Sequence, residues 1–145
     1  MYCKLCIEGE NGKIDITDKN VIKKIDVKVF QNDKSANDRS EQLFAEVMVQ
    51  GVLNEKSQKE TCEIFEWSKK TDKANVYRKV SIQVYKQEEL LRDYYLKDMY
   101  CASYREIFNE YIENDGSEAE SESEGSFILE MKQRKGSIDT IVVEC

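Results

Sequence analysis

The sequence contains no histidine and no proline among its 145 residues. Without histidine the chain lacks the commonest general base near neutral pH, the commonest metal ligand, and both the Ser-His-Asp and Cys-His nucleophile systems. It also has no phosphate-binding glycine loop, no dinucleotide-binding motif and no G-x-S-x-G motif. The absence of proline suits a sheet protein in which nearly every backbone N–H is needed in a ladder. We therefore predict that the chain is not an enzyme and has no catalytic, cofactor-binding or metal site.

Long hydrophobic runs are missing as well. No apolar stretch approaches the roughly 20 residues that cross a bilayer, and residues 1–6 lack the basic and apolar regions of a signal peptide. We expect a chain that is made in the cytoplasm and does not insert into a membrane.

The net charge is −7, with the basic residues interleaved among acids. This charge argues against nucleic acid as a specific partner, because phosphate contacts need a cationic surface.

The pattern that is present is that of β-strands within one domain. A chain of this length suits a single domain over residues 1–145. Apolar and polar residues alternate with period two in several segments, which is typical of half-buried strands. These segments are residues 2–8, 25–29, 43–49 (ended by Gly51), 80–84, 90–96, 126–133 and 138–144. Residues 134–137 separate the last two, and the Lys135-Gly136 step predicts a β-hairpin between them.

Four segments depart from this alternation. Residues 56–70 place Ile64 and Trp67, with Cys62 and Phe65, close to helical spacing, which predicts one amphipathic helix packed on the sheet. Residues 105–112 fit either an aromatic strand or a helical turn. Residues 32–40 form a polar loop. Residues 114–125 are acidic, rich in serine and almost free of apolar groups, so we predict a flexible loop within the domain.

The acidic loop has two functional interpretations besides that of a solvated segment. Its serines have acidic flanks, which suits phosphorylation by acid-directed kinases. Its carboxylates could bind calcium loosely, although they lack the spacing and central glycine of an EF-hand loop. The composition favours the solvated loop.

The five cysteines are Cys3, Cys6, Cys62, Cys101 and Cys145, and we interpret them as reduced thiols. Cys3-x-x-Cys6 could be a redox dithiol or half of a zinc site. A redox pair usually lies at a helix N-terminus, whereas this pair lies in a predicted strand, where three-residue spacing points the side chains to opposite faces. A structural zinc site needs a second close pair, and the other cysteines are isolated. The sequence favours packing of one or both thiols in the core.

Aromatic side chains cluster in the second half of the chain. They could stack on bases or sugars, but an acidic chain without a basic stripe favours packing within the sheet or against a neighbour. The residues are Tyr94, Tyr95, Tyr100, Tyr104, Phe108 and Tyr111.

The order of features over roughly residues 20–145 resembles a known family. The strand with VMVQGVLN precedes the polar helix ending in FEWSKKTD, which is followed by VYRKV, RDYYLKDMY, an aromatic segment, the acidic loop and FILEMKQRKGSIDTIVV. This order is similar to that of inner-tube proteins of contractile injection machines. These are the tube proteins of phage tails, of phage-tail-like bacteriocins and of type VI secretion, where the tube protein is the haemolysin-coregulated protein.

The resemblance implies two packed antiparallel sheets, or a small distorted β-barrel, flanked by one α-helix near residues 56–70. It also implies six copies joined edge to edge in a ring, rings stacked into a tube, and sheath and baseplate proteins as partners in a phage-tail-like particle. It carries over no catalytic residues. Two other hypotheses stay open from the residues: a monomeric β-barrel that binds a small ligand, and a small enzyme that uses carboxylates or a thiol.

Overall fold

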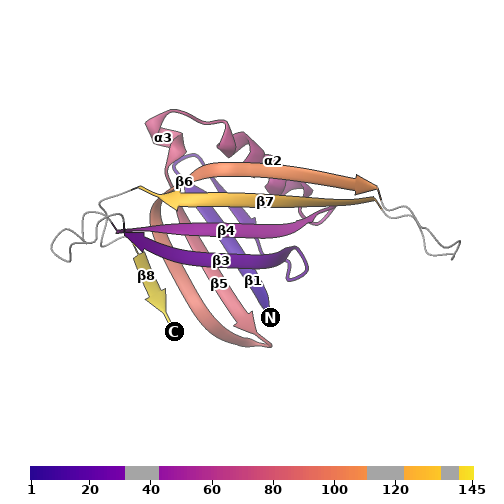
Figure 1. Ribbon diagram of the computed structural model, residues 1–145, viewed down its shortest axis with the longest axis horizontal. Coiled ribbons are helices and arrows are strands. Elements are labelled where there is room, and N and C mark those ends of the chain that lie inside the picture. The colour runs from indigo at the N-terminus through magenta and orange to yellow at the C-terminus, as the bar shows by residue number, and fades with distance from the viewer. Residues whose placement is uncertain (32–42, 111–122, 135–140) are drawn as a thin grey trace, which may run out of the picture.

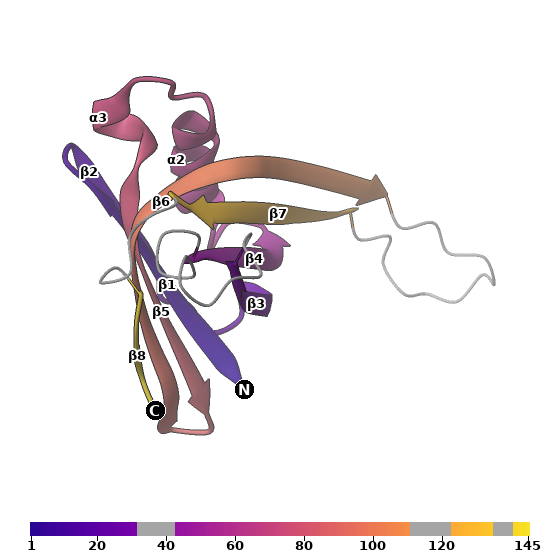
Figure 2. The same cartoon turned by 60° about the vertical axis from the view of Figure 1, so that its left-hand side comes forward.

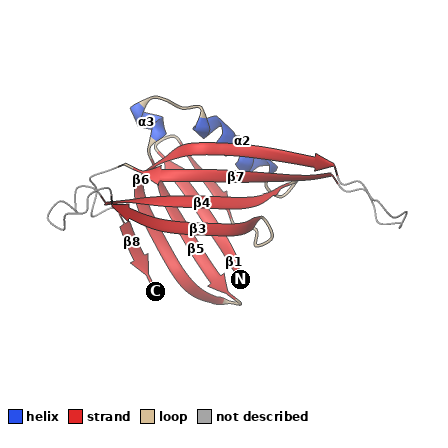
Figure 3. Ribbon diagram, viewed as in Figure 1, coloured by secondary structure: helices blue, strands red, loops and turns tan. Residues whose placement is uncertain are grey.

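The computed structural model describes residues 1–31, 43–110, 123–134 and 141–145 (Figure 1). Strands dominate the described chain, and the helices lie together on one side (Figure 3). The strands are β1 (Tyr2–Gly9), β2 (Gly12–Ile16), β3 (Ile22–Gln31), β4 (Leu43–Leu53), β5 (Arg78–Lys86), β6 (Glu89–Glu110), β7 (Ser123–Gln133) and β8 (Ile141–Glu144). The helices are α2 (Gln58–Ser68) and the single turn α3 (Lys73–Val76).

The strands form one antiparallel sheet in the order β2-β1-β5-β6-β7-β4-β3, with β8 paired to β6 as a branch. Figure 2 shows that this sheet bends sharply, so that β6, β7, β4 and β3 form one layer and β1, β5 and β8 descend from it with the start of β6. The predicted mainly β fold is therefore confirmed. The two layers are joined through β6, and the described strands do not close into a barrel.

The bend lies in the 22-residue strand β6, which leaves one layer and enters the other. Its first half pairs with β5 as far as Met99, and its second half pairs with β7 from the same residue onward. Asp98, with a φ of 56°, lies in an irregular step of the β5 pairing, and a further step lies between Cys101 and Ser103 in the β7 pairing. Such bulges bend a strand and increase its twist, so the two steps account for the corner.

A single hydrophobic core lies between the two layers. Leu5 and Ile82 of the descending layer and Val49 of the other are almost completely buried, as alternate positions of half-buried strands should be. The helix α2 closes the core with Ile64 and Trp67. The amphipathic helix predicted over residues 56–70 is therefore confirmed with slightly shorter bounds.

The hairpin predicted between residues 126–133 and 138–144 is wrong. β7 and β8 each pair antiparallel with β6, so the two strands run in the same direction. They also lie on the same edge of β6, opposite β5, with Gln133 paired to Met99 and Ile141 paired to Leu96. The two strands therefore do not pair with each other. The predicted turn itself lies outside the described residues, apart from Arg134.

Strand β4 continues through Gly51, which we had expected to end it. A Cβ atom at Gly51 would lie 2.7 Å from the Phe127 ring and from the Val21 carbonyl oxygen. Because such a separation is shorter than van der Waals contact, glycine is required here by close packing and not by a turn.

Replacing Gly51 with alanine is expected to lower the free energy of unfolding by about 1–3 kcal/mol, since the added methyl group overpacks the site. Gly12 is the matched control, because a Cβ there meets nothing within 4 Å. Urea unfolding of both variants checks this. Equal stabilities for the Gly51→Ala and Gly12→Ala proteins would contradict the close-packing explanation.

Several predicted segments lie outside the residues that the structure describes. The polar loop at 32–40 and most of the acidic loop at 114–125 are among them, although β7 already begins at Ser123. The ambiguous segment 105–112 is strand as far as Glu110. In the described part of the chain, no helix is long and apolar enough to span a membrane.

Candidate assembly surface

The layer made of β3, β4, β7 and the second half of β6 has two open lateral edges. On one side β3 pairs with β4, and on the other the second half of β6 pairs with β7. No described strand pairs with the outer edge of either one. We call these four strands the wall layer, and the two edges its β3 edge and its β6 edge. Unpaired strand edges expose free backbone N–H and C=O groups and are ready templates for pairing with another chain.

One face of the wall layer is closed by the rest of the molecule. Val47, Leu129 and Met131 on this face are at most 2% exposed, because the descending layer and α2 pack over them. Tyr104 of β6 also points to this side and packs edge-on against Phe65 of α2, with 5.9 Å between ring centroids. We call this the core face.

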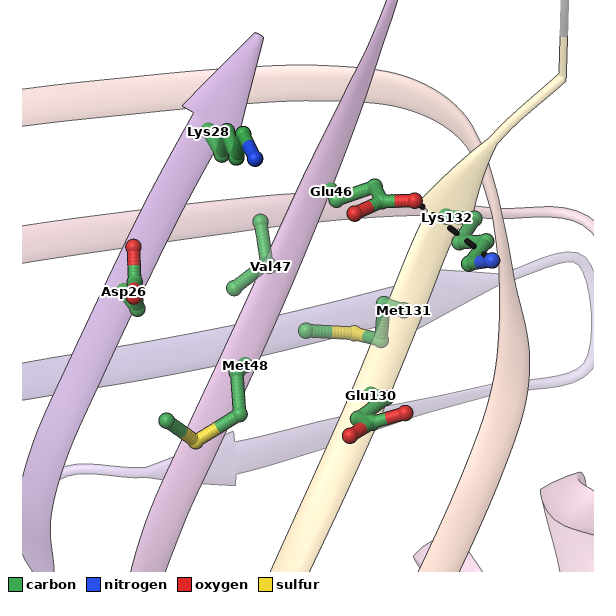
Figure 4. Close-up of a pocket in the computed structure, with 8 residues that line it drawn as sticks. All are labelled: Asp26, Lys28, Glu46, Val47, Met48, Glu130, Met131 and Lys132. Carbon is green, nitrogen blue, oxygen red and sulfur yellow. Dashed lines mark ion pairs between the residues drawn. The ribbon is translucent and has the colours of Figure 1, made fainter. Parts of the chain in front are cut away.

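The opposite face, which we call the outer face, carries charges in rows that run across the strands. Figure 4 shows one row formed by Lys28, Glu46 and Lys132, with an ion pair between Glu46 and Lys132 at 3.4 Å. In the next row Asp26 and Glu130 flank Met48. These residues surround a shallow groove of about 240 Å³ that is open to solvent.

A third row on this face contains Lys24 and Arg105 at the two edges, with Gln50 and Ile128 between them. Across the three rows the cations Lys24, Lys28, Lys132 and Arg105 stand against the anions Asp26, Glu46 and Glu130. The face is thus almost balanced in charge, although the whole chain carries −7. The net acidity of the sequence does not describe this surface.

The β6–β7 ribbon extends past the end of β4, and both views show it projecting from the body (Figures 1 and 2). β4 ends opposite Gly125, whereas the pairing of β6 with β7 continues to Glu110. Phe108 pairs with Gly125 at the base of this projection and is 69% exposed. The ribbon therefore presents a large apolar side chain to solvent at one end of the strands.

The aromatic residues singled out in the sequence mostly pack within the protein. Tyr94 lies against the core, and Tyr104 contacts Phe127 as well as Phe65. Tyr100 packs edge-on against Tyr77, at 6.1 Å between ring centroids. Phe108 is exposed, Tyr95 is half-buried with the Lys97 ammonium 5.9 Å from its ring centroid, and Tyr111 lies outside the described residues. No continuous aromatic platform for bases or sugars results from these placements.

The Cys3-x-x-Cys6 motif lies in β1, as predicted. Cys3 packs against the core, while Cys6 points to the other face beside Asp15. Burial raises the pKa of both thiols, which is the opposite of the activation that a redox pair needs. Within the described residues no group of three or more cysteine or acidic side chains is arranged to hold a metal ion.

The cysteines should differ in their reactivity. Burial raises the pKa of Cys101 from 9.0 to about 11, which leaves about 100-fold less thiolate at neutral pH than an unshifted thiol has. Cys62 and Cys145 are exposed. Timed alkylation at pH 8, read by mass spectrometry, is expected to modify Cys62 and Cys145 first and Cys101 last. Early modification of Cys101 in the folded protein would contradict this order.

The fold is that of a mainly β protein with a bent antiparallel sheet and one covering helix. No family model matches the sequence, and no curated protein matches it. Hcp1 from Flavobacterium johnsoniae has a similar structure, with a TM-score of 0.52 and 14% sequence identity over 99% of this chain and 94% of that one.

Two structures of contractile particles give weaker matches. A chain in the anti-feeding prophage baseplate matches with a TM-score of 0.49 and 11% identity over 99% of this chain and 92% of that one. A chain in the sheath-tube complex of an extracellular contractile injection system in its extended state matches at 0.45 and 12%, over 99% and 88%. The resemblance seen in the sequence is thus confirmed at the level of the fold.

Proposed function

We propose that this chain is a structural subunit that assembles into hexameric rings, which stack into the inner tube of a contractile phage-tail-like particle. The observation that carries the proposal is the wall layer, a four-stranded layer with both lateral edges unpaired among the described strands. The fold shared with Hcp1 supports it, and so does the sequence order that resembles inner-tube proteins.

The strand directions in the wall layer suit closure into a ring. Its strands alternate in direction, so β3 at one edge runs opposite to the second half of β6 at the other. A β3 edge placed beside the β6 edge of a second copy therefore extends the sheet as an antiparallel ladder. The contact is head-to-tail, and head-to-tail contacts close into rings when the rotation between copies allows it.

The shape of the subunit indicates which face of the wall layer would turn inward. The descending layer and α2 both lie on the core face. Since the inside of a ring offers less room than the outside, the descending layer and α2 would point away from the ring axis. The outer face of the wall layer, which is the face opposite the core, would then point toward the axis and line the channel. Six wall layers at about 4.8 Å per strand would give a circumference of about 115 Å before any strand tilt. The channel would then be lined by the rows of mixed charge.

The same proposal defines the partners and the location of the chain. Rings stack on further rings through the ends of the strands, and sheath and baseplate proteins of the same particle surround and terminate the tube. The chain acts by assembly and performs no catalysis. It is made in the cytoplasm, and it works in the finished particle.

Electron microscopy of the untagged full chain at high concentration tests the proposal. We expect rings with a central channel, and short tubes where rings have stacked. Mass photometry of the same sample should show a species of six chains. A protein that stays monomeric at every concentration, alone and with its sheath and baseplate partners, would overturn the proposal.

The alternative of a monomeric β-barrel for a small ligand loses its structural basis. It needs a closed barrel, and the described strands form an open, bent sheet. The space between the layers is filled by buried side chains such as Phe127 and Leu129.

A further inference from the structure

We propose that Asp26 of one copy pairs with Arg105 of the next, and that this pair sets the register of the ladder between subunits. The inference rests on the proposed ring and adds the contact that holds it. Both residues lie on the outer face of the wall layer, Asp26 on its β3 edge and Arg105 on its β6 edge.

Both charges are free to meet a partner outside their own chain. Each side chain is exposed, and neither forms an ion pair within 4.0 Å among the described residues. Within the sheet Asp26 stands opposite Met48, and Arg105 stands opposite Ile128. Asp26 on the β3 edge and Arg105 on the β6 edge thus have no ion-pair partner among the described residues.

The pleat of the sheet limits the registers that are available. Directly opposed residues of an antiparallel pair point to the same face, and a shift of one residue would place every core-side group of one strand on the outer face of the other. Asp26 therefore has to stand opposite an outer-face residue of β6. In the regular stretch beyond the bulge, these residues are Ser103, Arg105, Ile107 and Asn109.

Charge decides among the four registers. With Asp26 opposite Asn109, Asp26 would face a neutral side chain, and Arg105 would stand opposite Phe30. With Asp26 opposite Ser103, Lys24 would stand directly opposite Arg105. With Asp26 opposite Ile107, Lys28 would stand directly opposite Arg105. Like charges directly opposite each other destabilise a sheet, whereas opposite charges stabilise it. With Asp26 opposite Arg105, neither lysine faces a cation, because Lys28 meets Ser103 and Lys24 meets Ile107.

The same register also suits the core side of the join. Val27 would stand opposite Tyr104, and both are half-buried residues that already pack against the core. A β-branched residue beside an aromatic ring is a favourable cross-strand pair. Ile25 would stand opposite Glu106, the one pairing of an apolar with an acidic residue on this side. The ladder would thus continue the core as well as the backbone hydrogen bonds.

Charge reversal tests the pairing. Asp26→Arg and Arg105→Asp are each expected to raise the concentration needed for half-assembly by at least about tenfold, because each places like charges face to face at every joint of the ring. The double variant, Asp26→Arg with Arg105→Asp, restores the opposite charges and should recover assembly. Asp15→Arg is the matched control, since it makes the same charge change on the exposed edge strand β2 and should leave the rings intact.

Mass photometry over a concentration series gives the readout, and thermal melting verifies that all variants fold. Because both side chains are exposed, the melting temperatures of the dissociated variants should match that of the parent chain at a concentration where it is also dissociated. If the parent forms rings but the double variant does not recover them, the register is wrong and the proposed function stands. If single reversals leave assembly unchanged, the register is also wrong. If the parent forms no rings at any concentration, alone or with its sheath and baseplate partners, both proposals fall.

Discussion

Replacing Trp67 with alanine is expected to lower the free energy of unfolding by about 3–5 kcal/mol, the range for removing a large buried aromatic side chain. Trp67 is 2% exposed and lies where α2 closes the core. Its indole N–H donates to the Val76 carbonyl oxygen at 3.0 Å, and the Arg78 guanidinium lies 5.3 Å from its ring. The substitution would therefore leave a cavity, an unpaired carbonyl group and an unstacked arginine.

Thermal and urea unfolding measure this effect, with an expected fall in melting temperature of about 10–20 °C. Two variants separate the causes. Trp67→Phe keeps most of the buried ring but loses the hydrogen bond, so its loss should be smaller, about 1–2 kcal/mol. Phe65→Ala on the same helix is the control for a partly exposed ring, because Phe65 is 45% exposed. A Trp67→Ala protein no less stable than the Phe65→Ala protein would show that α2 does not anchor the core.

The sequence was sufficient to predict the helix because its signal is local. Ile64 and Trp67 are three residues apart, which places them on one face of a helix, and both are buried. The same spacing rule could not predict which of the neighbouring apolar residues are buried. Cys62 and Phe65 were included in the apolar face, yet both are exposed in the structure, since only the contact with the sheet decides how wide the buried stripe is.

Strands were predicted well where one face is buried, and poorly where the sheet bends. The alternation located β1, β3, β4 and β5, but β2 was missed although Asn11-Gly12 and the alternating Ile14 and Ile16 marked it. The hairpin assigned to β7 and β8 failed for a different reason. Alternation and a Lys135-Gly136 step say nothing about which strand is the partner, and both strands pair with β6, far away in the sequence.

The candidate assembly surface could not be predicted from the sequence. An open edge exists only once the order of strands is known, and that order joins segments separated by many residues. Asp26 and Arg105 illustrate this, because neither belongs to a motif and each is one charge among many. They become candidates for a contact between copies only because they lie at opposite edges of one layer and on the same face. The sequence did provide the resemblance to tube proteins, and the similarity to Hcp1 confirms it at the level of the fold.

Replacing Gln133 with leucine is expected to lower the free energy of unfolding by about 2–4 kcal/mol, because two buried backbone groups lose their partner. Gln133 is 2% exposed at the end of β7, where β6 turns from one layer into the other. Its side-chain oxygen accepts a hydrogen bond from the Ala45 N–H at 3.1 Å, and its amide nitrogen donates to the Lys97 carbonyl oxygen at 2.9 Å. The side chain therefore joins β4 to β6 at the corner, where the regular ladder is interrupted.

Urea unfolding and hydrogen exchange measure the two consequences separately. The free energy of unfolding reports the overall loss, and the exchange rate of the Ala45 amide reports whether the corner opens locally. Gln50→Leu is the matched control, since Gln50 lies half-buried on the outer face of β4 and its replacement should change stability by less than about 0.5 kcal/mol. Because Gln133 holds the start of β4 against β6, the Gln133→Leu chain should also assemble less well at temperatures where it is still folded. A Gln133→Leu protein that matches the control in stability and in Ala45 exchange would show that the corner is held by the bulges of β6 alone.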